Sequence, residues 1–423
     1  MTDQHPAGQL SDAVACRLAH PASVPGSLTS RPWWRQSLAH GAPGIALLHI
    51  ERAAAGLAPW QPAHDWLTCV TRAPVTAGAD SHLFYGAPAL AHALACAAAQ
   101  RPGSCMRALD ALDQAIAADA RTRVAHAHAR IDEGRLPALA EFDVIRGLAG
   151  IGSHLLRRDP DGNAVRAVLE YMVRLTEPVT AGEETLPGWW TACGPAGRDS
   201  DRFPGGHANL GVAHGIGGPL ALLAKALRQG ITVDGHREAI GRICAWLDRW
   251  RADTGLTWPY WVSRPQLRSG LRDFPAAQRL GWCYGTAGLA RAQQLAALAT
   301  GDSARRNMAE HALARALADP AQRAVTTSSS LCHGYAGLAH LAAAAAADAT
   351  PVTASRLHAL VPGLLDAVQP AGTDPESTAA GLLNTPGRGP GFLEGASGVA
   401  LAVLPASGSP ASHSGWDTCL LIT

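Results

Sequence analysis

The chain has almost no excess of charge of either sign. Its 423 residues include 35 lysines and arginines against 34 aspartates and glutamates. No run of basic residues forms the footprint expected for binding to nucleic acid or to an anionic membrane. Any partner must therefore be recognised at a local site.

Signals for export and for membrane insertion are also missing. The first residues, MTDQHPAGQLSDAVACRLAH, lack a basic start and a long apolar run, so they do not form a signal peptide. The run AHLAAAAAADA is too short and too weakly apolar to span a bilayer. The nine cysteines are an odd number without the dense spacing of a disulfide framework. We therefore expect a cytoplasmic protein in which carefully placed cysteines are ligands or nucleophiles.

A convincing alternating strand pattern is likewise absent, and a repeat takes its place. Seven copies of a Gly-x-x-Gly frame occur between residue 38 and the end of the chain, and only the second copy has an alanine, Ala89, in place of its second glycine. The first glycines of the frames are Gly41, Gly86, Gly147, Gly215, Gly285, Gly334 and Gly395.

Each frame is typical of the start of a helix. Glycine permits a tight turn, and the residues that follow are apolar on nearly every face, as in helices buried on both sides. Amphipathic segments between the frames, such as residues 236–252, would form outer helices. We predict an all-α protein in which seven inner and seven outer helices close into an α/α toroid. The unequal spacing of the frames favours this closed ring over an open helical solenoid.

This prediction assigns residues 38–423 to the toroid and residues 1–37 to an N-terminal extension that contains the first outer helix. If all inner helices start at one end of the ring, the residue before each first glycine should point to a common centre. Seven polar residues occupy that position: His40, Tyr85, Arg146, His214, Tyr284, His333 and Glu394.

Two frames carry a cysteine one residue further back, where the other five have Ala, Phe, Ile, Ala and Leu. Cys283, Cys332 and His333 therefore form a candidate zinc site, since two thiolates and one imidazole suit Zn²⁺ and leave a fourth position for water or substrate. The alternative is two buried cysteines and an ordinary histidine. The matching positions in consecutive frames favour the metal.

Two further residues are candidates for proton transfer beside the metal. His214 occupies the same frame position as His333, and Asp143 is an acidic residue among apolar ones, four positions before Gly147. A lone aspartate before a helix is also a common helix N-cap, so that alternative stays open. Arg279, together with Trp282, Tyr284 and Glu394, is a candidate to line the cavity.

These motifs resemble the lanthionine synthetase C-like proteins, the cyclases of class I lanthipeptide biosynthesis. The resemblance rests on FDVIRGLAGIG, NLGVAHGIGG, RLGWCYGTAG, LCHGYAGL, GFLEGASGVAL and the ending GWDTCLLI, and it extends from about Leu38 to the C-terminus. It implies an α/α toroid with a catalytic zinc held by Cys283, Cys332 and His333.

The resemblance also implies a reaction that belongs to antibiotic biosynthesis. A peptide cysteine thiol adds to dehydroalanine or dehydrobutyrine and forms a lanthionine or methyllanthionine ring. His214 is the first candidate donor of the proton to the α-carbon, and Asp143 and Arg279 match family positions near the metal. The substrate would be a dehydrated precursor peptide. Residues 1–37 are too few to hold a dehydratase domain, so a separate dehydratase partner is expected, and a complex with a membrane transporter is a further candidate.

Other functions compete with this interpretation. A related zinc enzyme that joins glutathione to dehydrated residues would use the same metal and the same acid. A non-catalytic scaffold that binds a leader peptide is also compatible with the motifs. A protein prenyltransferase fits less well, because it needs a carboxylate ligand and an aromatic tunnel. A carbohydrate-active toroid would need paired carboxylates across a cleft and would leave the two cysteines unexplained.

Overall fold

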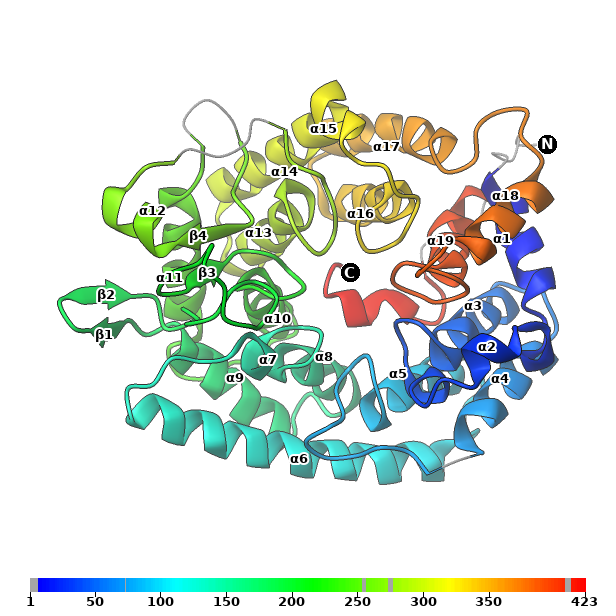
Figure 1. Ribbon diagram of the computed structural model, residues 1–423, viewed down its shortest axis with the longest axis horizontal. Coiled ribbons are helices and arrows are strands. Elements are labelled where there is room, and N and C mark those ends of the chain that lie inside the picture. Colours follow the sequence, from blue (N-terminus) through cyan, green and yellow to red (C-terminus); the bar gives the residue numbers. More distant parts are fainter. Residues whose placement is uncertain (1–6, 73, 253–255, 273–276, 408–411) are drawn as a thin grey trace. The chain divides into compact units, whose positions relative to one another are not determined.

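Glycine determines where the principal helices begin. The computed structural model describes residues 7–72, 74–252, 256–272, 277–407 and 412–423, and each of the seven glycine frames leads into a helix (Figure 1). The predicted helix starts are thereby confirmed. The seven helices are α3 (Ala42–Ala54), α5 (Ala87–Gln100), α8 (Leu148–Arg158), α10 (Gly217–Arg228), α13 (Thr286–Thr300), α16 (Tyr335–Asp348) and α19 (Ala396–Val403).

The chain divides into two compact units. The first contains Met1–Ile116, Thr326–Cys419 and Thr423, and the second contains Ala117–Val325 and Leu420–Ile422. The other elements of the first unit are α1 (Ala7–Arg17), η1 (Pro21–Ser23), α2 (Gly26–Thr29), η2 (Trp34–Gln36), α4 (Gln61–Thr71), α17 (Pro351–Asp366), α18 (Pro375–Asn384), η3 (Leu404–Ser407) and most of η4 (Trp416–Leu420). Those of the second are most of α6 (Met106–Asp132), α7 (Leu139–Phe142), α9 (Asn163–Leu175), α11 (His236–Arg249), α12 (Arg264–Ser269), α14 (Ser303–Ala318), α15 (Pro320–Ala324) and the strands given below.

Six of the seven frame helices pack against a helix of the same unit that does not start at a frame. The pairs are α3 with α4, α16 with α17 and α19 with α1 in the first unit, and α8 with α9, α10 with α11 and α13 with α14 in the second. In α11 the buried residues Ile240, Ile243 and Leu247 recur at helical spacing, so one face of the helix is apolar, as expected of an outer helix. The frame helices also contact one another, in the order α16, α19, α3, α5 in the first unit and α8, α10, α13 in the second.

The second glycine of the frame is required by close packing. At Gly337 a side-chain Cβ would lie 1.8 Å from the carbonyl oxygen of Leu331, and at Gly398 it would lie 1.7 Å from that of Phe392. Gly44, Gly218 and Gly288 show the same approach to the carbonyl six residues earlier, at 2.3, 2.6 and 2.1 Å. In these five frames the chain therefore folds back tightly over the first turn of the helix and leaves no room for a side chain. The second frame has Ala89 at this position and still leads into α5.

Backbone hydrogen bonds join neighbouring frames through one repeated carbonyl, that of the residue two before the first glycine. In the first unit, this carbonyl of Leu393 accepts from the Cys332 amide (2.8 Å), that of Ala39 from the Phe392 amide (2.8 Å) and that of Phe84 from the Leu38 amide (3.0 Å). In the second unit, Ala213 accepts from Val144 (3.0 Å) and Cys283 from Val212 (3.0 Å). The repeat thus fixes the backbone of both cysteine positions.

Four short strands interrupt the helical pattern, all in the second unit. β1 (Val179–Ala181) pairs with β2 (Glu184–Leu186), and β3 (His207–Asn209) pairs with β4 (Trp261–Ser263), both antiparallel. Figure 1 shows the β1–β2 hairpin at the edge of this unit and β3–β4 near α12. Strands of three residues are too short to produce an alternating pattern, which explains why the sequence did not reveal them.

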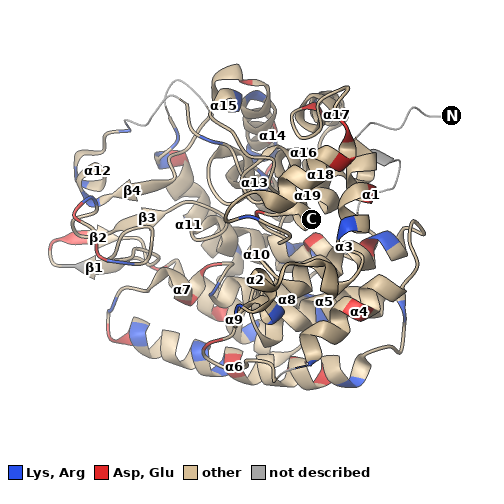
Figure 2. Cartoon of the chain, turned by 45° about the vertical axis from the view of Figure 1, so that its right-hand side comes forward, with Lys and Arg blue, Asp and Glu red and all other residues tan. Residues whose placement is uncertain are grey.

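Charge is spread over the outer helices rather than gathered by sign. Figure 2 shows basic and acidic residues following one another along α6, whereas α10 and α16 are mostly uncharged. In the part of the chain that the structure describes, none of the helices combines the length and the apolar character needed to cross a membrane.

Candidate metal and acid–base site

Cys283 is held in the turn that precedes α13. Its side chain is buried, and its carbonyl accepts hydrogen bonds from the amides of both Val212 (3.0 Å) and Ala213 (3.3 Å) in the neighbouring frame. Gly211 makes this approach possible, because a Cβ there would lie 2.6 Å from the Cys283 carbonyl oxygen. The thiol is therefore carried on backbone that has little freedom to move.

Cys332 and His333 lie in the corresponding turn before α16. The Cys332 side chain is buried, and a buried serine pair supports the turn: the Ser328 hydroxyl donates to the Ser330 hydroxyl (3.0 Å), which accepts from the His333 amide (3.4 Å). Arg388 donates to the Ser328 hydroxyl (3.0 Å) and so completes the support from the other side. This network orders the turn that presents the thiol and the imidazole.

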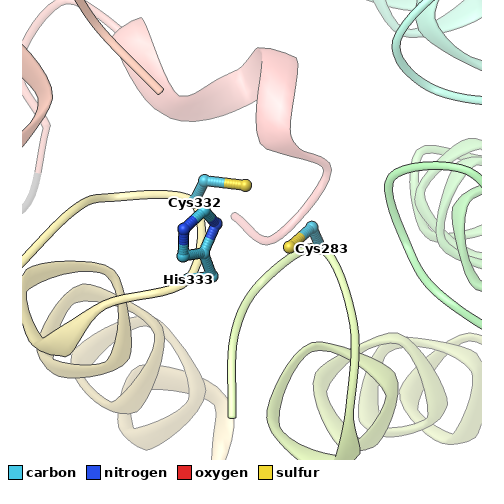
Figure 3. Close-up of side chains that lie close together, drawn as sticks. All are labelled: Cys283, Cys332 and His333. Atoms are coloured by element: carbon cyan, nitrogen blue, oxygen red, sulfur yellow. The ribbon is translucent and has the colours of Figure 1, made fainter. Parts of the chain in front are cut away.

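The three predicted ligands are brought together. One ligand atom from each of Cys283, Cys332 and His333 lies within 4.8 Å of the other two. Figure 3 shows the two sulfur atoms and the imidazole facing the same small space. Across the described residues, this is the one group of three or more such side chains that meets a metal-binding spacing. The pairing of cysteines in consecutive frames is thus matched by their positions in space.

The donor set fits zinc. Zinc binds thiolate sulfur at about 2.3 Å and imidazole nitrogen at about 2.0–2.1 Å in tetrahedral geometry, which places donors roughly 3.5–3.8 Å from one another. The observed spacing of up to 4.8 Å is within about 1 Å of that requirement. None of the nine cysteines forms a disulfide, so neither thiol is consumed in that way. Two thiols and one imidazole also leave a fourth tetrahedral position, as catalytic zinc sites require.

Asp143 and His214 form a hydrogen-bonded pair in the second unit. One carboxylate oxygen of Asp143 lies 2.7 Å from Nδ1 of His214, and the other accepts from the amides of Arg146 (2.6 Å) and Gly147 (2.8 Å). The Asp143 side chain is 2% exposed and that of His214 is 36% exposed. Asp143 therefore binds the amides of the turn before α8 and holds the imidazole at the same time, although the N-cap residue of α8 itself is Gly147. The part of Asp143 in proton transfer stays a prediction.

Tyr284 adjoins this pair. Its ring centroid lies 6.3 Å from that of His214, and its hydroxyl oxygen accepts from the side-chain amide of Asn209 (3.0 Å). The Asn209 carbonyl oxygen in turn accepts from the Gly211 amide (3.0 Å), within the segment that holds Cys283. One short stretch of chain thus connects a proposed metal ligand, the tyrosine and the histidine.

The backbone of Arg279 binds Tyr260, a neighbour of Tyr284. The carbonyl oxygen of Arg279 accepts from the Tyr260 hydroxyl (2.6 Å), and the Arg279 side chain is exposed. Burial raises the pKa of Tyr260, and the positive charge of Arg279 opposes this rise. In the first unit, burial lowers the pKa of His40, and the negative charge of Glu394 opposes that change. The Arg279 charge thus acts on a tyrosine outside the frames, and the Glu394 charge acts on the histidine of the first frame.

Sequence analysis missed the residues that support the site. They lie outside the Gly-x-x-Gly frames, and the repeat predicts no role for them: Asn209, Tyr260, Ser328, Ser330 and Arg388. The run TTSSS directly before the sixth frame was a usable signal, since three serines before a metal-binding turn can supply hydrogen bonds to its backbone. The contributions of Tyr260 and Arg388 depend on tertiary contacts and have no local signature.

Comparison with known proteins agrees with the sequence motifs. A family profile described as "Lanthionine synthetase C-like protein" matches residues 32–421. Among solved structures, one described as "Nisin cyclase" aligns with a TM-score of 0.76 and 20% sequence identity, covering 98% of this chain and 96% of that one. No curated protein matches the sequence.

The structural likeness shows the predicted α/α toroid fold over essentially the whole chain. The family match covers nearly all of the chain as well, including every glycine frame, the two cysteine positions and the Asp143–His214 pair. The chain therefore belongs to the lanthionine synthetase C-like family.

Proposed function

We propose that this protein is a zinc-dependent cyclase that adds cysteine thiols of a dehydrated peptide to dehydroalanine or dehydrobutyrine and so forms lanthionine or methyllanthionine rings. The observation that carries the proposal is that Cys283, Cys332 and His333 lie close together in this chain. The chain is a member of the lanthionine synthetase C-like family. The hydrogen-bonded Asp143–His214 pair, next to the turn that holds Cys283, adds a group able to move a proton.

Cys283, Cys332 and His333 would hold the metal ion, and a zinc ion bound there would lower the pKa of the substrate thiol as a Lewis acid. The chain's own residues account for the protons. In the addition, the thiol loses its proton, sulfur bonds to the β-carbon, and the π electrons move to an enolate whose α-carbon gains a proton. His214 can accept the first proton at Nε2 and return one to the α-carbon, which balances the reaction.

Asp143 makes His214 suitable for this role. Its carboxylate accepts from Nδ1–H of the imidazole, which leaves Nε2 as the nitrogen that exchanges protons. The negative charge of Asp143 also stabilises the imidazolium that forms between the two transfers. Because the other Asp143 oxygen is bound to two backbone amides, the imidazole is held in one orientation. Arg279 is proposed to act near the reacting atoms through its exposed guanidinium.

The reaction needs a substrate in which serine or threonine has already lost water. A dehydratase must therefore act first, and we propose that it is a separate protein; association with a peptide transporter is a further proposal of the same kind. Nine cysteines without a disulfide are consistent with the reducing cytoplasm as the place of the reaction.

The test compares wild-type protein with Cys283→Ala and Cys332→Ala, and uses Cys244→Ala, a buried thiol of α11, as the matched control. We expect about one zinc ion per chain in the wild type and the control, and loss of zinc from both site variants with the helical circular-dichroism spectrum retained. A synthetic peptide with one dehydroalanine and one cysteine should then lose its reactivity toward a thiol-alkylating reagent at unchanged mass, because cyclisation is an isomerisation.

Zinc-free wild-type protein that still cyclises the peptide would contradict the role of the metal. Zinc-loaded protein that joins free glutathione to the dehydroalanine, but does not close the ring, would instead favour the glutathione-type enzyme. Unchanged zinc content in both site variants would show that the metal lies elsewhere.

A further inference from the structure

Four aromatic side chains form a continuous surface in the second unit that extends from His214. We call Tyr284, Tyr260, Trp261 and Phe203 the aromatic wall. The Tyr284 ring lies 5.5 Å from Tyr260 and 6.3 Å from Trp261, and the Phe203 ring lies 5.4 Å from Trp261, measured between centroids. Because Tyr284 also contacts the His214 ring at 6.3 Å, the wall begins at the proposed acid–base group.

These rings are not ordinary core residues. Aromatic residues make up only 5% of the chain, and most of the tryptophans, such as Trp190, Trp258 and Trp282, are fully buried. All four rings of the wall are instead half-buried. A cluster of large aromatic rings that keeps part of its surface in contact with water is typical of a binding surface rather than of a packed interior.

Hydrogen bonds fix the wall to its supporting backbone. Asn209 of β3 donates to the Tyr284 hydroxyl oxygen, and the Tyr260 hydroxyl donates to the Arg279 carbonyl. Trp261 lies in β4, where it pairs with Asn209 of β3. The polar ends of the two tyrosines are therefore occupied by the protein, and the surfaces left for a ligand are apolar ring faces.

Two arginines beside this strand pair share one carboxylate. Arg264, which follows β4, donates to Glu184 of β2 at 2.7 Å, and Arg268 of α12 also pairs with Glu184. Hydrogen bonds from both arginines hold the pKa of Glu184 at about 2. The four rings of the wall themselves carry no charge, so the surface that they offer is apolar.

We propose that the aromatic wall is a binding subsite for apolar side chains that flank the dehydro residue in the peptide substrate. The inference rests on the proposed cyclase function and names a feature of the substrate, an apolar segment next to the reacting residue. Such side chains lose contact with water against the rings, and the wall places them next to His214. The wall thus selects which dehydro residue reaches the site.

The test measures binding without turnover. Two fluorescein-labelled synthetic heptapeptides each carry one dehydroalanine and one S-methylcysteine, which cannot cyclise; leucine flanks the dehydroalanine in one peptide and serine in the other. Fluorescence anisotropy gives the dissociation constant of each peptide for wild type, Trp261→Ala and Phe203→Ala. The control is Trp60→Ala, a half-buried tryptophan of the first unit that packs under Arg101.

We expect wild type and the Trp60→Ala control to bind the leucine peptide about fivefold to tenfold more tightly than the serine peptide, as partial burial of leucine on the rings predicts. Trp261→Ala and Phe203→Ala should each reduce this ratio to about twofold or less. Equal binding of both peptides by wild type, or an unchanged ratio in Phe203→Ala, would overturn the proposal. Phe203 lies in a loop, where a substitution disturbs the fold less than in a strand. The Phe203→Ala variant therefore tests the proposal even if Trp261→Ala fails to fold.

Failure of the proposed function is distinguishable from failure of this inference. If the wild type forms no lanthionine but retains its preference for the leucine peptide, the wall is a peptide-binding surface on a protein with another activity, which supports the inference alone. If the wild type forms lanthionine with equal affinity for both peptides, the function stands and the wall has no role in selection. The Cys283→Ala variant should keep the preference while losing turnover.

Discussion

Asp143 serves two structural partners with its two carboxylate oxygens. One binds the amides of the turn before α8, and the other binds Nδ1 of His214. A neutral amide side chain of the same shape can keep the bonds to the turn amides and lose the bond from the imidazole. Asparagine still offers one carbonyl oxygen to the backbone amides, but its other atom is an NH₂ group that cannot accept from the imidazole.

We therefore expect Asp143→Asn to fold normally and to cyclise the dehydroalanine peptide about 100-fold more slowly, because the imidazole loses its orientation and the charge that stabilises imidazolium. Its zinc content should match that of wild type. Asp143→Ala should show the same slow turnover and, in addition, lose about 1–2 kcal/mol of stability, since two backbone amides, one of them buried, lose their acceptor. Wild-type turnover by Asp143→Asn would assign the residue a purely structural role.

Two buried histidines should set the acid limit of stability. Burial lowers the pKa of both His49 and His207 from 6.5 to about 4. Each has one ring nitrogen bound to a backbone carbonyl, that of Leu18 for His49 and that of Cys193 for His207. Among the described residues, Nε2 of His207 has no hydrogen-bond partner, so a proton added there would be buried without an acceptor.

The direction of the pH dependence follows from these values. Well above pH 6.5 both histidines are neutral in the folded and the unfolded chain, so they do not affect stability there. As pH falls from 6.5 to 4, the unfolded chain takes up protons that the folded chain does not, and each histidine should cost about 3 kcal/mol by pH 4. Urea unfolding between pH 4 and 7 measures this loss.

The variants His49→Gln and His207→Asn keep a donor for the backbone carbonyl and cannot titrate. Each should therefore remove the loss of stability that its own histidine causes between pH 6.5 and 4. The exposed His358 in α17, changed to glutamine, is the control and should leave the slope unchanged. An undiminished slope in both buried-site variants would mean that other groups determine the acid limit.

Among the elements, helix α16 depends on the second glycine of its frame. In α16 a Cβ on Gly337 would lie 1.8 Å from the carbonyl oxygen of Leu331, and that carbonyl belongs to the backbone just before Cys332. Since a backbone atom cannot yield as a flexible side chain can, Gly337→Ala should displace the metal-binding turn. We expect a loss of about 3 kcal/mol of stability and reduced zinc content.

Gly241 provides the matched control within another helix. It lies in the interior of α11, it is exposed, and a Cβ there would have no heavy atom within 4 Å. Gly241→Ala should therefore raise stability by about 0.5–1 kcal/mol through helix propensity. Thermal unfolding followed by circular dichroism compares Gly337→Ala with Gly241→Ala. A shift of the melting temperature in the same direction for both would contradict a steric requirement for glycine at position 337.

The features of the fold and the site that the sequence could predict are those that repeat along the chain. The frame recurs seven times, so its role as a helix start could be inferred from repetition alone, and so could the match between the two cysteine positions. The support of Cys332 and His333 by Ser328, Ser330 and Arg388 could not, because residues 328 and 388 are distant in sequence and nothing local marks them as partners. The aromatic wall depends likewise on strands of three residues, which are too short to leave a periodic signal.

At the scale of the whole molecule, the last residues of the chain are divided between the two units. Residues up to Cys419 belong to the first, where Asp417 pairs with the buried His340 (2.9 Å) and the Trp416 carbonyl lies 3.0 Å from His92. Leu420–Ile422 belong to the second. One segment is thus part of the core of both units, so its loss should affect the molecule as a whole.

In the second unit, this segment supplies acceptors to two buried donors. The Trp282 indole donates to the Leu420 carbonyl and the Arg291 guanidinium to the Ile422 carbonyl, both at 2.7 Å. Trp282 is 2% exposed and Arg291 is 1% exposed, so water cannot replace the lost carbonyls without opening the structure. Trp282 also precedes Cys283, which connects the segment to the proposed metal site.

We expect deletion of residues 422–423 to lower stability by several kcal/mol, because it removes the apolar Ile422 side chain and leaves the Arg291 charge without one of its acceptors. Replacing Arg291 by methionine in the shortened chain should restore part of the loss, since an apolar side chain of similar length needs no acceptor there. Thermal unfolding and zinc content are measured for the full-length and the shortened chain, each with arginine and with methionine at position 291. The four proteins show whether the effect of the substitution depends on the deletion. If Arg291→Met costs as much in the shortened chain as in the full-length chain, the Ile422 carbonyl does not stabilise the guanidinium and the segment contributes by apolar burial alone.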